Sequence, residues 1–104
     1  METKPVGLDR REAERFAVDL PATLRGYRQS PVDARVDDVS TGGALIAADA
    51  PDILRGDEIL LDLDWCEFVV TVAWTTEGHL GVIFHRPLHA VELNGLREQG
   101  RRRS

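Results

Sequence analysis

Apolar and polar residues alternate with a period of two along most of the chain between residues 18 and 84. This period is typical of strands that bury one face, because successive side chains of a strand point to opposite sides. The pattern predicts six short strands, in VDLPATLR (18–25), VDARVDD (32–38), GALIAA (43–48), LRGDEILLDLDW (54–65), EFVVTVAWTT (67–76) and HLGVIFHR (79–86).

The alternation also predicts which side chains face the core. The clearest inward rows are Ile59, Leu61, Leu63 and Trp65; then Phe68, Val70, Val72 and Trp74; then Leu80, Val82 and Phe84. Turn signals, such as those at Gly56 and Gly78, separate the strands about every ten residues. Six strands at this spacing predict a small all-β antiparallel barrel or sandwich, and a closed six-stranded barrel hides its sheet edges.

The two ends of the chain differ from this body. Residues 1–15 are polar and contain Pro5 and Gly7, so we expect a flexible N-terminal arm. The last eighteen residues, PLHAVELNGLREQGRRRS, space Leu88, Val91 and Leu96 for one face of a helix. A single domain follows, with an arm over 1–15 and a barrel over 16–104 that a short C-terminal helix caps.

Composition supports a single folded domain. The chain has 104 residues and 42% hydrophobic residues, which is enough for one core without disulfides. It has no uninterrupted apolar run of the length that a membrane helix needs, and its first residues do not form a signal peptide. We therefore expect a cytoplasmic protein without membrane insertion, in which the single cysteine, Cys66, packs in or beside the core.

Charge is unevenly distributed along the chain. The net charge is −5, and residues 29–96 carry three basic side chains against twelve acidic ones, whereas residues 97–104 carry four against one. An acidic body of this kind repels a long polyanion, so we expect no nucleic-acid polymer as partner. A small anion held by a local arginine cluster is compatible with this distribution.

The common catalytic and metal-binding motifs are absent. The sequence has no phosphate loop of the G-x-x-x-x-G-K-[ST] type, no G-x-G-x-x-G and no H-E-x-x-H. His85 and His89 are separated by Pro87 and lack a neighbouring cysteine or carboxylate cluster. Ser40 has a turn context unlike that of a catalytic serine. We expect no enzyme, no metal and no cofactor.

Two separated motifs carry the remaining signal. RREAER places Arg11 and Arg15 at an R-x-x-x-R spacing, and DDVSTGG places Asp38, Ser40 and Gly43 at D-x-S-x-x-G. About one R-x-x-x-R is expected by chance among twelve arginines, and a second copy does occur at residues 97 and 101. Only about 0.03 chance matches are expected for the second motif, so it carries most of the information.

With these two motifs the chain resembles the PilZ domain family, cytosolic bacterial receptors for the second messenger cyclic di-GMP. The resemblance covers nearly the whole chain. It includes the arginine motif before the first strand, the Asp-Ser-Gly motif between the second and third strands, GDEILLDL, a Trp in the following strand, and GVIF in the last strand. It implies a PilZ-type barrel that binds this ligand.

The resemblance also implies roles for matching residues. Arg11 and Arg15, with Arg10 as a third contact, would bind phosphate or guanine. A guanidinium group forms bidentate hydrogen bonds with phosphate oxygens or with guanine O6 and N7, and it also stacks on bases. In the other motif, Asp38 would accept hydrogen bonds from guanine N1 and N2. The remaining candidates are Ser40, which would bond a base edge or hold the turn, Gly43, which would allow close backbone approach, and Trp74, which would contact the ligand or be core.

Three functions follow as hypotheses. The first is a receptor that orders its N-terminal arm over cyclic di-GMP and signals in trans to a downstream protein partner. The second is a PilZ-like adaptor in motility or pilus assembly that does not bind the nucleotide. The third is a nucleic-acid-binding barrel, which the small number of aromatic residues and the acidic body disfavour.

Overall fold

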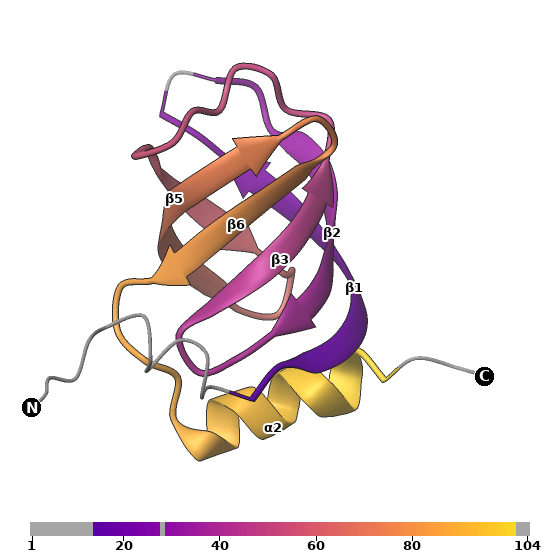
Figure 1. The fold of residues 1–104 in the computed structure, drawn as a ribbon. Helices are drawn as coiled ribbons and strands as arrows, with labels where there is room; N and C mark the ends of the chain where they lie inside the picture. Colours follow the sequence, from indigo (N-terminus) through magenta and orange to yellow (C-terminus); the bar gives the residue numbers. More distant parts are fainter. Residues whose placement is uncertain (1–13, 28, 102–104) are drawn as a thin grey trace, which may run out of the picture.

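The structure is a computed structural model, and residues 14–27 and 29–101 are described. The described part contains six strands and one helix: β1 (Phe16–Arg25), β2 (Val32–Val39), β3 (Gly43–Ala48), β4 (Glu58–Asp62), β5 (Glu67–Thr76), β6 (His79–Phe84) and α2 (Ala90–Gln99). The strands form a closed antiparallel barrel in the order β1-β2-β3-β6-β5-β4 (Figure 1). The expected six-stranded barrel with a C-terminal helix is confirmed, whereas the expected arm lies almost entirely outside the described residues.

The barrel closes because β1 is long enough to pair with two strands. Its whole length pairs with β2, and its last three residues also pair with β4, Thr23 opposite Asp62 and Arg25 opposite Leu60. The Arg25 side chain adds an ion pair to Asp62 at 3.1 Å across this seam. Closure leaves no long open sheet edge for another chain to extend.

Alternating side chains from all six strands fill the barrel interior. Leu24, Ile46, Leu61, Val70 and Val72 are at most 1% exposed. The phenyl rings of Phe68 and Phe84 meet at 5.2 Å between centroids in a tilted arrangement, which is the geometry that aromatic pairs prefer. The period of two in the sequence therefore corresponds to the observed core.

Both tryptophans depart from the predicted inward rows. Trp65 is 51% exposed, because the chain turns at Asp64 (φ 82°) and the β4–β5 connection closes with the Leu63 N–H donating to the Cys66 carbonyl at 2.9 Å. Trp74 is 42% exposed. A bulge in β5 sets Val72 opposite Val82 and Trp74 opposite the very next residue, Gly81, so the extra residue turns Trp74 to the outside.

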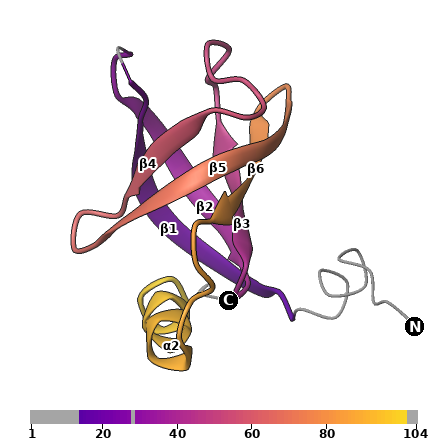
Figure 2. The ribbon, with the colours of Figure 1, turned by 90° about the vertical axis from the view of Figure 1, so that its left-hand side faces the viewer.

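Helix α2 covers one end of the barrel, the end where β1 begins and where β2 turns into β3 (Figures 1 and 2). Leu96 is buried, Leu93 is partly buried against the core, and a Cβ on Gly100 would come within 3.0 Å of Val18 and Leu20. Val91 is 82% exposed, so its predicted place on the buried face was wrong. The buried face of the helix runs through residues 93, 96 and 100 instead.

Hydrogen bonds stabilise both ends of α2, through the Glu92 side chain at its start and through the backbone at its end. At its start the Glu92 carboxylate accepts the His89 N–H at 2.8 Å and binds both terminal nitrogens of Arg86. The hydrogen bonds from Arg86 and from the His89 backbone lower the pKa of Glu92 to about 2. At its end the Gly100 carbonyl accepts the Asp19 N–H at 2.8 Å, at a register shift of β1 between Ala17 and Leu20. No helix in the described part of the chain is long and apolar enough to cross a membrane.

Candidate ligand-binding site

The turn between β2 and β3 is built around the Ser40 side chain. Ser40 is only 8% exposed, and its Oγ accepts the backbone N–H groups of Gly42 at 3.3 Å and Gly43 at 3.2 Å. The Ser40 N–H donates to the Gly43 carbonyl at 2.9 Å. Serine favours such turns because its hydroxyl bonds the backbone two or three residues further on. The hydroxyl therefore holds the turn, which is one of the two roles expected for it.

Gly43 is required for close contact between β3 and β6. A Cβ at this position would overlap the Val82 carbonyl oxygen in the neighbouring strand, whereas Gly42 has open space around it. The turn is also tied to the segment that leads to α2, because Phe84 N–H donates to the Gly42 carbonyl at 2.9 Å and Leu88 N–H to the Thr41 carbonyl at 2.8 Å. Packing alone thus accounts for glycine at residue 43, and its role toward a ligand stays a prediction.

Asp38 lies on the outside of the barrel just before this turn. A register shift in β2 between Val36 and Asp38 sets Asp38 opposite Leu45. Leu45 in turn lies opposite Gly81 of β6. The adjacent Val39 and Ala44 pair points inward and is buried. Asp38 therefore belongs to an outward row that crosses three strands.

Trp74 continues the same row on a fourth strand. It pairs with Gly81, and its indole lies so close above this glycine that a Cβ on Gly81 would overlap it. Trp74 and Asp38 thus face the same side of the sheet, with Leu45 and Gly81 between them, and the Trp74 indole covers the buried Gly81. We call this face, made of Asp38, Leu45, Gly81 and Trp74, the outer row.

Arg15 joins the two sequence motifs in space. Its guanidinium donates to the Asp38 carboxylate at 3.1 Å, and the side chains are 61% and 22% exposed. Exposed pairs of this kind contribute at most about 1 kcal/mol, so the contact does little for stability. It does place one arginine of R-x-x-x-R against the aspartate of D-x-S-x-x-G, while Arg10 and Arg11 lie outside the described residues.

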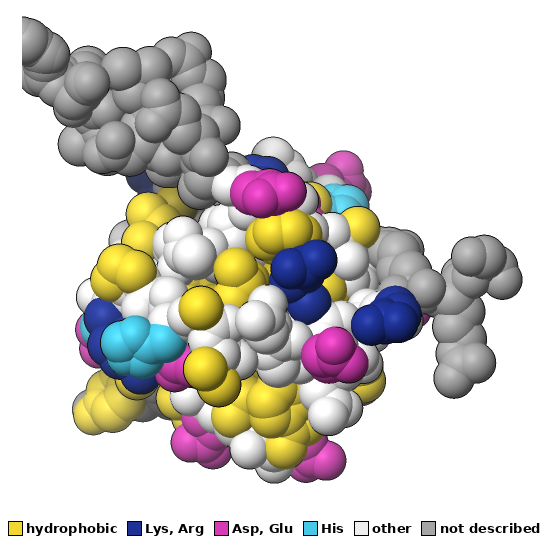
Figure 3. Space-filling view, turned by 90° about the horizontal axis from the view of Figure 1, so that it is seen from below, with side chains coloured by type: hydrophobic (Ala, Val, Ile, Leu, Met, Phe, Trp, Pro, Cys, Tyr) yellow, Lys and Arg dark blue, Asp and Glu magenta, His cyan; other side chains and the backbone are white. Residues whose placement is uncertain are grey.

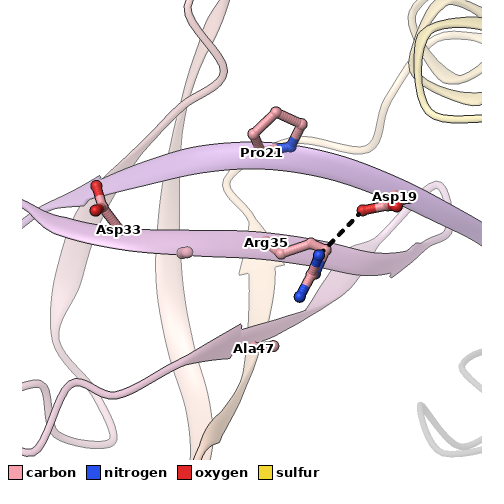
Figure 4. Close-up of a pocket in the computed structure, with 6 residues that line it drawn as sticks. Asp19, Pro21, Asp33, Arg35 and Ala47 are labelled. Atoms are coloured by element: carbon pink, nitrogen blue, oxygen red, sulfur yellow. Dashed lines mark ion pairs between the residues drawn. The ribbon is translucent and has the colours of Figure 1, made fainter.

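The aspartate beside Asp38 has different surroundings. Asp37 lies 3.7 Å from His79 and 3.8 Å from Arg35. Arg35 also reaches toward Asp19 at 3.6 Å, in a hollow of about 440 Å³ on the outside of β1, β2 and β3 (Figure 4). Asp33 lines the same hollow. Carboxylates therefore surround the only arginine in its lining, which makes it a poor anion site.

Two arginines that the sequence had marked only as a chance repeat lie near Arg15. Arg97 and Arg101, on the last turn of α2 and just beyond it, line a cleft together with Arg15 and Phe16. The guanidinium of Arg97 stacks on the Phe16 ring at 3.8 Å. The spacing of four between Arg97 and Arg101 in the predicted C-terminal helix was the sequence signal for this pair, because residues four apart share one face of a helix. Contact with the start of β1 depends on the tertiary fold.

The remaining titratable side chains form no metal-binding cluster in the described ranges. His85 lies 3.1 Å from both the Glu58 carboxylate and the Thr71 hydroxyl, and no group of three or more metal-ligating residues occurs among residues 14–27 and 29–101. Burial, followed by the charges of Glu92 and Asp62, raises the pKa of the Cys66 thiol. A raised pKa disfavours the reactive thiolate.

Comparison with known proteins agrees with the geometry. The model of the PilZ domain family matches residues 9–99, which include both motifs, all six strands and α2. No curated protein matches the chain.

Proposed function

The chain belongs to the PilZ domain family, and on this premise we propose that it is a cytoplasmic receptor for cyclic di-GMP. The ligand lies on the outer row, which runs from Asp38 beside the β2–β3 turn across β3 and β6 to Trp74 of β5. Arg15 and Asp38 bind it there, Arg11 and Arg10 complete the arginine contacts, and Trp74 borders it on the far side.

The ion pair between Arg15 and Asp38 carries this proposal. Arg15 and Asp38, from motifs separated by twenty-two intervening residues, meet at 3.1 Å on one exposed surface. Guanidinium matches the geometry of phosphate oxygens and of guanine O6 and N7, and a carboxylate accepts the N1 and N2 hydrogens of guanine. The pair therefore provides one group for each polar feature of a guanine nucleotide.

The rest of the outer row suits a flat base. The indole of the half-exposed Trp74 covers the buried Gly81 and presents an aromatic face, and Leu45 adds apolar surface beside it. Base stacking on an aromatic side chain contributes about 1–3 kcal/mol per base. We place Trp74 at the border of the ligand site for this reason, and Ser40 and Gly43 beneath it as the residues that shape the turn.

Signalling follows from the position of the arginines in the chain. Arg10 and Arg11 precede the first strand, so binding of both to one ligand fixes the preceding segment over the barrel end. A segment ordered in this way presents a new surface, and a downstream protein reads this surface in trans. The site supplies hydrogen bonds, charge and stacking, and this function requires no catalytic step.

Calorimetric titration with cyclic di-GMP tests the proposal. Wild type is expected to bind with micromolar or tighter affinity. Arg15→Ala and Asp38→Ala are expected to lower the affinity about tenfold or more, because a hydrogen bond to a charged group contributes about 1.5–3 kcal/mol. The matched controls are Arg25→Ala and Asp62→Ala, which break an ion pair of the same length, 3.1 Å, across the β1–β4 seam. Wild-type affinity in the first two variants would refute the site, and no binding by wild type would refute the receptor.

The adaptor function has one observation in its favour. Val69 and Ile83, on the outside of β5 and β6, are each 45% exposed, and exposed apolar side chains on a sheet suit a protein partner. This alternative does not require Arg15 or Asp38. Failure of wild type to bind cyclic di-GMP, together with a partner interaction that Val69→Ser and Ile83→Ser abolish, would favour the adaptor.

A further inference from the structure

A second basic surface adjoins the proposed ligand site. A cleft of about 580 Å³ lies between the beginning of β1 and the end of α2. Its polar and aromatic lining consists of Arg15, Phe16, Asn94, Arg97, Glu98 and Arg101. Arg15 belongs to both places, since it lines the cleft and also contacts Asp38 of the outer row. The cleft and the outer row are therefore continuous through this one side chain.

The lining of the cleft is cationic although the protein is acidic. Three guanidinium groups face one carboxylate there, whereas the whole chain has a net charge of −5. The carboxylate, Glu98, pairs with Arg101 at 3.6 Å, with 73% and 75% of the two side chains exposed. An exposed pair at this distance is weak. Most of the five N–H donors of Arg101 stay available to a ligand.

Arg97 is held in place by its aromatic neighbour. Its guanidinium carbon lies 3.8 Å from the centre of the Phe16 ring. Stacking occupies the flat face of the guanidinium and leaves its edge, which carries the N–H donors, directed away from the ring. A group fixed in this way loses less conformational entropy when it binds an anion.

Helix α2, which lines one side of the cleft, is anchored to the barrel core. Leu96, directly before Arg97 in sequence, is 2% exposed, and Gly100, directly before Arg101, packs against Val18 and Leu20. The carbonyl end of a helix carries about half a negative charge, which opposes an anion. Three guanidinium groups outweigh this partial charge. Figure 3, which views the molecule from the helix end, shows basic side chains among hydrophobic and acidic ones on this face.

We propose that Arg97 and Arg101 are ligand-binding residues that hold a phosphodiester group in this cleft. This inference rests on the proposed function, because the phosphodiester is one of the two in cyclic di-GMP. Arg15 lies between Asp38 of the outer row and the cleft. A nucleotide whose guanine binds Asp38 therefore has a phosphate within reach of Arg97 and Arg101. The end of α2 then belongs to the receptor site, and the R-x-x-x-R at residues 97 and 101 acts as a second arginine motif.

Calorimetry on variants of the full chain tests the role of these arginines. Arg101→Gln removes a guanidinium without disturbing packing, and it is expected to weaken cyclic di-GMP binding about fivefold or more, in line with loss of one charge-assisted contact. The double variant Arg97→Gln/Arg101→Gln is expected to lose more, and Arg55→Gln is the control. Wild-type affinity in Arg101→Gln and in the double variant would overturn the inference even if Asp38→Ala abolishes binding.

Arginine side-chain NMR supplies a readout that does not depend on the proposed function. The Nε–Hε signals of Arg97 and Arg101 are followed during titration with cyclic di-GMP and, separately, with inorganic pyrophosphate. Both probes are expected to shift both signals, with Arg55 unchanged. Shifts with pyrophosphate but not with cyclic di-GMP would show that the cleft binds an anion, and would overturn the inference that this anion is the nucleotide's phosphodiester. If calorimetry also shows no cyclic di-GMP binding, the proposed receptor function would be overturned as well. Unchanged signals with both probes would overturn the cleft as a site.

Discussion

Two tight turns at opposite ends of the barrel use glycine for different reasons (Figure 1). The β5–β6 turn contains Gly78, which has φ +87° and open space around it. Its carbonyl accepts the Ala48 N–H at 3.0 Å. Glycine serves there to adopt a backbone conformation that other residues rarely adopt.

The β2–β3 turn has a different construction. Gly43 is needed because the backbone of β6 passes too close for any side chain, and the Ser40 hydroxyl accepts two backbone N–H groups inside the turn. Asp38 and Arg15 meet directly beside it. These groups, placed around a fixed backbone, make the β2–β3 turn the proposed binding site. The β5–β6 turn has the backbone conformation without those groups.

The largest effect is expected from Gly43→Ala, which attacks the close contact. The added methyl group overlaps the Val82 carbonyl oxygen, so β3 and β6 must separate. We expect a loss of about 3 kcal/mol in the free energy of unfolding, at the upper end for overpacking. Urea denaturation measures it, with Gly42→Ala as control because no atom lies within 4 Å of a Cβ there. Equal stability of the two variants would show that the contact is not limiting.

Ser40→Ala removes the internal support of the same turn. Two backbone N–H groups lose their acceptor, and each hydrogen bond contributes about 1 kcal/mol. We expect a loss of about 2 kcal/mol in urea denaturation and a smaller loss of cyclic di-GMP affinity than in Asp38→Ala. An affinity loss as large as that of Asp38→Ala, with unchanged stability, would assign Ser40 to the ligand instead of the turn.

Gly78→Ala tests the opposite turn. An alanine at φ +87° is strained by about 1 kcal/mol, and it meets no neighbouring atom. We therefore expect a modest fall in the urea midpoint and an unchanged affinity for cyclic di-GMP by calorimetry. A large affinity loss here would remove the functional distinction between the two turns.

The smallest effect is the pH dependence of the contact at the start of α2. The folded pKa of Glu92, about 2, lies below its ordinary value of 4.5 because Arg86 and the His89 backbone bind the carboxylate. A depressed folded pKa stabilises the protein above the unfolded pKa, and this stabilisation is lost as the pH falls from about 4.5 toward 2. Urea midpoints of wild type and Glu92→Gln should therefore converge over this range. A difference that stays constant with pH would contradict the carboxylate's role.

Local sequence patterns predicted most of the fold and part of the site. All six strands, their buried rows and the helix follow from periodicity, whereas the outward position of Trp74 does not. The face of the sheet on which Trp74 lies depends on a bulge in β5. A bulge is defined by the pairing with the partner strand, here with Val82 and Gly81. Val91 failed for a related reason, because the buried face of α2 is selected by its contact with β1.

The same distinction applies to the site. Asp38 and Arg15 were found from motif spacing, and the structure brings them together at 3.1 Å. The turn-holding bonds of Ser40 and the packing requirement at Gly43 emerge only with β6 in place. Arg97 is defined by its stacking on Phe16, a contact between residues eighty-one positions apart in the sequence. Tertiary contacts of that separation leave no local pattern.

Amide NMR of the protein titrated with cyclic di-GMP tests the central claim most directly, since it reports on both turns in one experiment. We predict large shifts for residues 38–45 and for Trp74 and Gly81, with unchanged signals for residues 76–79 at the β5–β6 turn. Saturable shifts confined to residues 76–79, or a spectrum that does not change at millimolar ligand, would contradict the claim that the β2–β3 end of the barrel binds the nucleotide.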